Sequence, residues 1–101
     1  MIRFFLLAVV LASCSCSAVS PHDNFKNHME YHIGKEVDYP SSYVARYPQW
    51  VGDKTELRNG NEEVEFLQGK FCRVFFEVDK KSNVIIGWRF EGSKKDCQIV
   101  P

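Results

Sequence analysis

Two alternating runs near the end of this chain constrain its fold more than any other feature. They span residues 71–79 and 83–91, and the polar turn Lys80-Lys-Ser82 separates them. Every second residue is apolar, which is the pattern of a β-strand with one buried face. The residues predicted to share the buried face are Cys72, Val74, Phe76, Val78, Val84, Ile86, Trp88 and Phe90.

Antiparallel pairing of Val78 with Val84 would bring both apolar sets onto one face. The same register sets Phe76 opposite Ile86, and Phe75 opposite Gly87 on the other face. A slip by one residue would turn one apolar set toward solvent, so we expect this register to be strongly specified.

Two cysteines frame this predicted hairpin. Cys97 follows the second run closely enough to return to Cys72. In an oxidising compartment we expect a disulfide, and its 26-residue loop would contribute about 3–4 kcal/mol of stability in the chain-entropy description. The alternative is two buried free thiols.

The N-terminal residues have the order of a secretory signal. A positive start, Met1-Ile-Arg3, precedes nine apolar residues, Phe4 to Ala12, and small residues follow. The apolar run is too short for a membrane span, so we predict a signal peptide over residues 1–13. The alternative is a buried N-terminal strand.

The site of cleavage decides where the protein would reside. Leu11-Ala-Ser-Cys14 is similar to the lipobox of bacterial lipoproteins, which predicts lipidation of Cys14 and a tether over residues 14–21. In those lipoproteins an aspartate after the cysteine retains the protein at the inner membrane. Ser15 occupies that position, so the resemblance implies the outer membrane. Ordinary cleavage after Ala18 is the alternative, and the fate of Cys16 stays open.

The charge balance argues against two kinds of partner. Cleavage before Cys14 removes Arg3 as the single charged residue, leaving 12 basic against 13 acidic side chains. This balance gives no reason to bind nucleic acid. It also predicts no polybasic patch for a membrane.

The first half of the predicted domain, residues 22–101, is expected to be helical. Phe25, Met29 and Ile33 share one face of a helix over residues 21–33, with Ser20 as N-cap and Gly34 at the stop. A shorter helix is predicted to begin at Pro40 or Ser41 and to end before Pro48.

A further hairpin is predicted around Asn59-Gly60, a strong turn signal. Its strands would span residues 55–58 and 62–67, with Val64 and Phe66 facing inward. Two three-residue loops, 67–69 and 68–70, remain equally compatible with the strand that follows.

These elements predict an α+β fold, with two short N-terminal helices packed on a three- to four-stranded antiparallel meander. Besides the disulfide, the predicted core is Phe25, Met29, Val64, Phe66, Val74, Phe76, Ile86, Trp88 and Phe90.

The order of elements resembles the small outer-membrane lipoproteins of the SmpA/OmlA (BamE-like) class. Residues 33–38, followed by 44–48, are similar to that class's element of a glycine, a short helix and Gly-x-Pro. Tyr47-Pro48 stands here where the class has glycine and then proline. Residues 69–97 also resemble uncharacterised small bacterial lipoproteins. The resemblance implies a non-catalytic envelope protein that binds other proteins, without indicating which.

Candidate metal and catalytic residues are few. His28 and His32 lie four residues apart on one helix, near enough to share a metal. No third ligand is evident, although His22 could approach from the start of the helix. The alternative is that they flank the apolar stripe. No nucleophile or carboxylate pair has a recognisable setting, so we predict no metal, no cofactor and no catalysis.

The second sheet face carries the most specific binding prediction. It is too apolar for a solvated face, and arginines flank its aromatic residues, as in protein-binding patches. The predicted patch is Phe71, Arg73, Phe75, Ile85 and Arg89. The alternative is coverage by the loop at Trp50 or by the tether.

A second candidate surface is a group of four tyrosines, Tyr31, Tyr39, Tyr43 and Tyr47, which could instead pack between helix and sheet. The sequence therefore predicts a lipid-anchored periplasmic protein that binds an envelope protein. The alternative is a secreted or free periplasmic inhibitor of a hydrolase such as a lysozyme or protease, using loops at Asn59-Gly60 or residues 92–96.

Overall fold

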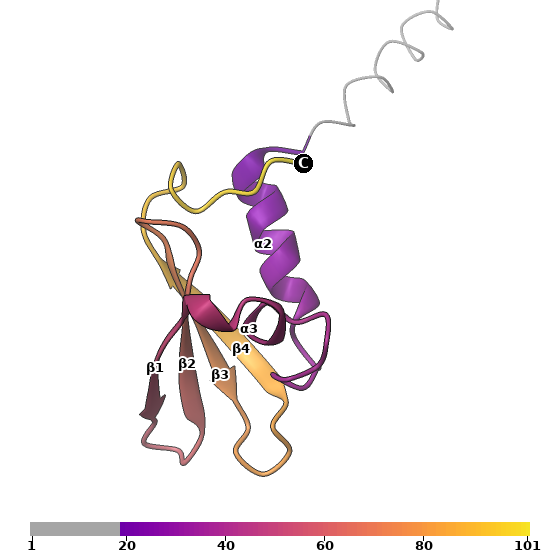
Figure 1. Ribbon diagram of the computed structural model, residues 1–101, viewed down its shortest axis with the longest axis vertical. Coiled ribbons are helices and arrows are strands. Elements are labelled where there is room, and N and C mark those ends of the chain that lie inside the picture. Colours follow the sequence, from indigo (N-terminus) through magenta and orange to yellow (C-terminus); the bar gives the residue numbers. More distant parts are fainter. Residues whose placement is uncertain (1–18) are drawn as a thin grey trace, which may run out of the picture.

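The computed structural model describes residues 19–101, which form a two-layer α+β domain (Figure 1). A four-stranded antiparallel sheet has the order β1-β2-β3-β4, and helix α2 lies against one face. The elements are α2 (Pro21–Tyr31), α3 (Tyr43–Arg46), the 3-10 turn η1 (Pro48–Trp50), β1 (Val51–Glu56), β2 (Glu62–Leu67), β3 (Arg73–Val78) and β4 (Ile85–Glu91). The predicted signal peptide, Cys14 and Cys16 lie outside the described residues.

Helix α2 begins where its capping residues predict. The Ser20 hydroxyl accepts a hydrogen bond from the Asp23 amide at 3.1 Å, and Pro21 takes the first helical position. Phe25 and Met29 are fully buried against the sheet. The helix ends at Tyr31, two residues before the predicted end, and Gly34 then adopts the left-handed conformation at φ +87°.

The predicted second helix is reduced to one turn. It begins at Tyr43 and not at Pro40 or Ser41. The buried Ser42 is its N-cap, and the Ser42 hydroxyl accepts from the Ala45 amide and donates to the Val37 carbonyl. The turn ends before Pro48, where η1 starts. The prediction of two helices is therefore correct for one full helix only.

The first hairpin places its apolar residues as predicted. Val64 and Phe66 are buried, and they pair with Phe76 and Val74 of β3. Gly60 has φ +90° in the turn between β1 and β2. The loop between β2 and β3 covers residues 68–72, longer than either predicted loop, because Leu67 pairs with Arg73.

The pairing of β3 with β4 differs from the predicted register by two residues. Phe76 lies opposite Trp88, and Val74 opposite Phe90. The ladder contains a bulge, so Val78 pairs with Ile85. Ile85 is consequently fully buried.

The bulge reverses the predicted orientation of Ile86, which is 49 % exposed and does not belong to the core. Residues 34–37 explain the reversal, because they pair with the start of β4. The Gly34 amide donates to the Ile85 carbonyl, and the Ile85 amide donates to the Lys35 carbonyl. This backbone pairing holds Ile85 in place, and its side chain faces inward.

The predicted disulfide between Cys72 and Cys97 is confirmed, with both cysteines fully buried. It holds the C-terminal segment beside the start of α2. There, the Ile99 amide donates to the Pro21 carbonyl, and His22 donates through Nδ1 to the Cys97 carbonyl at 2.7 Å.

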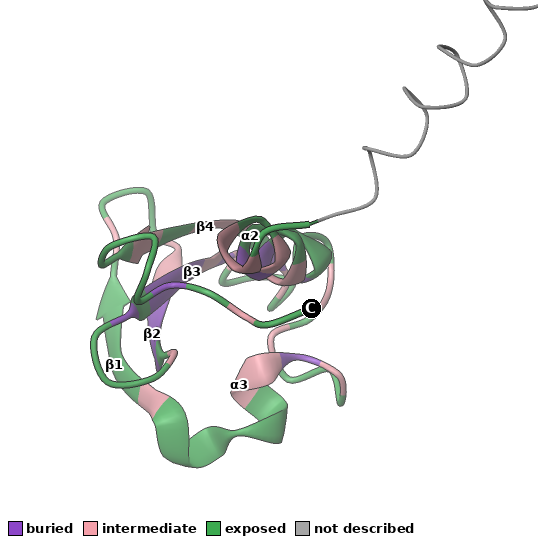
Figure 2. Cartoon of the chain, turned by 90° about the horizontal axis from the view of Figure 1, so that it is seen from above, coloured by how far each residue is buried: buried purple, intermediate pink, exposed green. Residues whose placement is uncertain are grey.

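The core lies between α2 and the two middle strands, as the buried residues in Figure 2 show. It comprises Phe25, Met29, Val64, Phe66, Cys72, Val74, Phe76, Val78, Ile85 and Cys97. Trp88 and Phe90 were predicted to be core residues, but they are half-buried at its edge. The Trp88 indole donates to Glu30 of α2 at 2.8 Å.

Because of the bulge, alanine substitutions of the adjacent residues Ile85 and Ile86 should differ in their effect on stability. Ile85→Ala should lower the free energy of unfolding by about 2–5 kcal/mol, because it leaves a cavity in the core. Ile86→Ala should change it by no more than about 0.5 kcal/mol. Urea unfolding monitored by tryptophan fluorescence measures both. The reverse order of the two effects would contradict the observed register.

Candidate functional site

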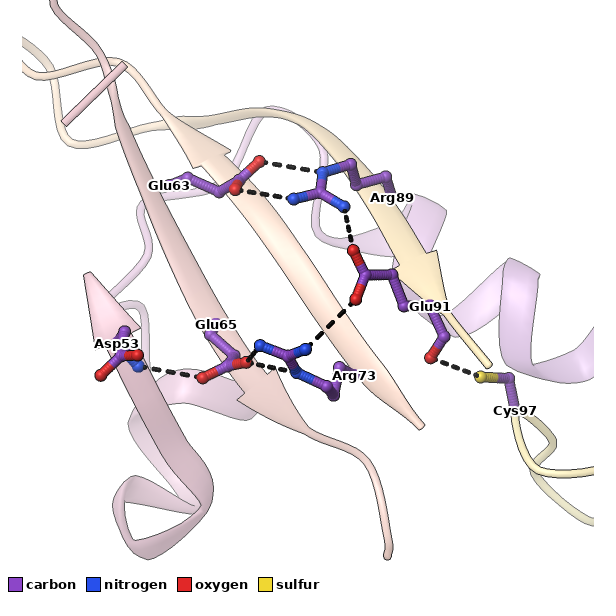
Figure 3. Close-up of polar contacts among 7 residues, drawn as sticks. All are labelled: Asp53, Glu63, Glu65, Arg73, Arg89, Glu91 and Cys97. Atoms are coloured by element: carbon purple, nitrogen blue, oxygen red, sulfur yellow. Dashed lines mark hydrogen bonds and ion pairs between the residues drawn. The ribbon is translucent and has the colours of Figure 1, made fainter. Parts of the chain in front are cut away.

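The outer face of the sheet, where the patch was predicted, carries a network of five charged side chains (Figure 3). Arg89 contacts Glu63 and Glu91, each at 3.0 Å. Arg73 contacts Glu65 and also Glu91, the latter at 3.2 Å. Both arginines therefore already have carboxylate partners within the domain.

The two arginines also cover Phe75. The guanidinium carbon of Arg89 lies 3.9 Å from the centre of the Phe75 ring, and that of Arg73 lies 5.2 Å away. Phe75 is only 8 % exposed as a result. The ring is thus covered by cation–π contacts from the same face of the sheet, whereas residues 14–18 of the predicted tether lie outside the described residues.

These contacts correct the predicted patch. Phe75 lies on the outer face but is buried there, opposite Arg89 and not opposite Gly87. Ile85 belongs to the core. Phe71 is 66 % exposed but precedes β3, beyond the end of the network. The prediction that the outer face exposes apolar side chains is therefore wrong for Phe75 and Ile85. Contact of Phe71, Arg73 or Arg89 with a partner stays a prediction.

Glu65 links this network to the edge strand. Its Oε1 accepts a hydrogen bond from the Asp53 amide at 3.1 Å, at an irregularity in the pairing of β1 with β2. A Cβ atom at Gly52 would overlap the Glu65 carboxylate, so a larger residue here would force that carboxylate to move. The Asp53 amide holds the pKa of Glu65 below its usual value, with Arg73 acting in the same direction.

Hydrogen bonds among His28, His32 and Tyr43 join the end of α2 to α3. We call this group of three residues the His32 interlock. His32 is 1 % exposed. Its Nδ1 donates to the His28 carbonyl at 2.8 Å, and its Nε2 accepts from the Tyr43 amide at 3.0 Å. His28 Nδ1 lies 2.6 Å from the Tyr43 hydroxyl. Because both His32 nitrogens are occupied, the pair cannot share a metal in this arrangement.

The interlock requires a neutral His32. A protonated ring would carry a hydrogen on Nε2, which would face the Tyr43 amide hydrogen in place of accepting it. Burial lowers the pKa of His32 below its ordinary value of 6.5, and the charges of Lys35 and His28 lower it further. The hydrogen bond to the His28 carbonyl partly offsets this decrease.

Two hollows adjoin the interlock, and Tyr43 and Tyr47 line both. The larger has a volume of about 620 Å³ and lies beside α2 and α3. The smaller has a volume of about 260 Å³ and lies over β2, where Trp50 and Phe66 line it. The residues around the larger hollow are Asn27, His28, Tyr31, His32, Ser41, Tyr43, Arg46 and Tyr47.

The hollows divide the predicted tyrosine group. Tyr31, Tyr43 and Tyr47 border a hollow, whereas Tyr39 is half exposed and lines neither. Trp50 lines the smaller hollow beside Tyr43 and Tyr47 and is 44 % exposed. Its position depends on η1, which the sequence analysis did not predict.

Within residues 19–101, no three or more histidine, cysteine or acidic residues gather in a group that could hold a metal ion. No helix in this part of the chain has the length and apolarity to cross a membrane. No protein-family model, curated protein or solved structure matches the chain.

The His32 interlock predicts a specific dependence of stability on pH. The unfolded chain binds a proton on His32 near pH 6.5, whereas the folded protein resists doing so. The stabilisation is therefore complete above pH 6.5 and is lost as the pH falls toward the lowered pKa, by at most about 1.4 kcal/mol per pH unit. Urea unfolding between pH 8 and pH 5 measures it.

The variant His32→Asn should lose this dependence of the free energy of unfolding on pH. The control variant His22→Asn should retain it. An NMR titration of the wild-type imidazoles gives the same information without any variant. A His32 ring that titrates at or above pH 6.5 would contradict the interlock.

Proposed function

We propose that the chain is a lipid-anchored, non-catalytic protein-binding accessory of the bacterial envelope. It would be attached through Cys14 to the periplasmic face of the outer membrane. The order of charged, apolar and small residues before Cys14 supports export. The buried disulfide supports an oxidising compartment for the domain.

The smaller hollow carries the binding part of this proposal. Tyr47 and Trp50 line it, and they are 36 % and 44 % exposed. Tyrosine and tryptophan are enriched among residues that dominate protein interfaces, where they fill pockets at the centre of the contact. The outer face is a weaker candidate, because its arginines are already paired with carboxylates.

A secreted inhibitor of a hydrolase is the second candidate, and the turn at Asn59 and Asn61 favours it. Both side-chain amides donate to the Glu77 carboxylate, at 3.0 Å and 2.9 Å. A projecting turn held in one conformation loses little entropy when it binds. Such a loop suits insertion into an enzyme cleft.

Labelling with a radioactive fatty acid in a bacterial host tests the anchor. The wild-type chain should incorporate the label, and Cys14→Ala should not, because the thiol of Cys14 is the proposed acceptor. Cys16→Ala is the matched control and should retain the label on Cys14. Absence of label from all three proteins would remove the anchor.

A photo-crosslinking amino acid at position 50 separates the two candidates. A membrane-embedded or envelope-assembly protein captured there, but not from position 86 on the outer part of β4, would support the accessory. A soluble hydrolase captured from position 59 instead would favour the inhibitor.

A further inference from the structure

We propose that the end of the domain nearest the N-terminal residues is a docking surface for an anionic lipid bilayer. This inference rests on the proposed anchor and extends it, since it assigns a second contact with the membrane. We call this end the anchor-proximal surface and define it as residues 19–20, 69–71, 92–96 and 100.

Three segments distant in sequence meet at the anchor-proximal surface, at the upper end of the molecule in Figure 1. The disulfide brings the β2–β3 loop beside the segment after β4. A Cβ on Gly92 would lie 2.7 Å from the Phe71 carbonyl oxygen, so these two backbones touch. The C-terminal segment then runs beside the start of α2, through the bond from the Ile99 amide to the Pro21 carbonyl.

Exposed apolar side chains lie on this surface from each of the segments. Phe71 is 66 % exposed, Val100 is 79 % exposed and Val19 is 46 % exposed. Phe71 is the most exposed aromatic residue in residues 19–101, although the neighbouring cysteine is fully buried. An exposed phenylalanine at the tip of a loop is suited to the boundary between headgroups and acyl chains.

Three lysines belong to the same surface. Lys70, Lys94 and Lys95 are exposed, and none has an ion-pair partner among the described residues. The ammonium of Lys70 lies 5.5 Å from the centre of the Phe71 ring. Asp96 is the single carboxylate in the two loops, and it accepts a hydrogen bond from Ser93.

The anchor-proximal surface has more positive than negative side chains, although the numbers of basic and acidic residues in the whole chain are equal. Glu63, Glu65 and Glu91 form ion pairs with arginines on the outer face, and none of them belongs to the anchor-proximal surface. Lysines near an anionic bilayer each contribute about 1 kcal/mol of attraction. The prediction that the chain has no polybasic patch stays a prediction, since this surface holds three lysines and one carboxylate.

The proposed lipid would hold this end close to the bilayer. Ser20 follows Cys14 by six residues, and a chain of that length extends at most about 20 Å. Electrostatic attraction decays over about 8 Å at physiological ionic strength, so only the end nearest the anchor can benefit. The turns at Asn59-Gly60 and Lys80–Ser82 lie at the opposite end (Figure 1).

Co-sedimentation with vesicles tests this surface without the anchor. Residues 19–101 include the four-stranded sheet, the core between the sheet and α2, and both bridging cysteines, so this span is the one to express. The span should partition onto vesicles of equal phosphatidylserine and phosphatidylcholine at low ionic strength, and less onto phosphatidylcholine alone. Lys94→Gln with Lys95→Gln should weaken partitioning roughly fivefold for each lysine.

The matched control is Lys80→Gln with Lys81→Gln, which removes the same charge from the opposite end and should leave partitioning unchanged. Phe71→Ser should weaken binding, and Ile86→Ser should not. Equal weakening by both lysine pairs would overturn the proposal. Equal binding of the span to anionic and to neutral vesicles would also overturn the proposal. That result is expected if a protein, and not a bilayer, covers this end of the domain. Because the span lacks Cys14, the vesicle assay does not test the lipid anchor. The fatty-acid labelling tests the anchor separately.

Discussion

The link between Cys72 and Cys97 is the constraint on which the arrangement of this domain depends. It joins the start of β3 to a C-terminal segment that has no regular structure of its own. That segment binds the first turn of α2 through Pro21 and His22. The position of the helix on the sheet is thus defined at one end by the cross-link and at the other by Trp88 and Glu30.

Much of this domain follows from local signals in the sequence. The cap at Ser20, the Asn59-Gly60 turn and the inward positions of Val64 and Phe66 all depend on residues close together in the chain. The disulfide could also be anticipated, because few cysteines were available. Each of these features has one dominant physical cause, and nothing distant opposes it.

The sequence-based predictions were wrong where contacts between residues distant in the chain determine the structure. Alternation places Ile86 inward, but residues 34–37 pair with the start of β4 and select Ile85. A period of two cannot locate a bulge, since the bulge interrupts the period itself. The buried Phe75 was misjudged for a similar reason. Its cover comes from Arg73 and Arg89, whose carboxylate partners lie on β2 and β4, and the sequence alone does not bring these strands together.

The His32 interlock shows the same limit at the candidate site. The spacing of His28 and His32 was visible, and it favoured either a metal or a flank of the apolar stripe. The partner of His32 is a backbone amide eleven residues further on, where a single helical turn begins. Polar roles of this kind depend on tertiary contact, so the pattern of histidines alone could not reveal them.

The most direct test of the central constraint is the free energy of unfolding of the wild type compared with Cys72→Ser/Cys97→Ser, by urea titration at pH 7.5. Removing the link should lower the free energy of unfolding by about 3–4 kcal/mol, the chain-entropy value for a loop of this length. A difference below about 0.5 kcal/mol would contradict the account, because the helix and the C-terminal segment would then hold their places without the cross-link.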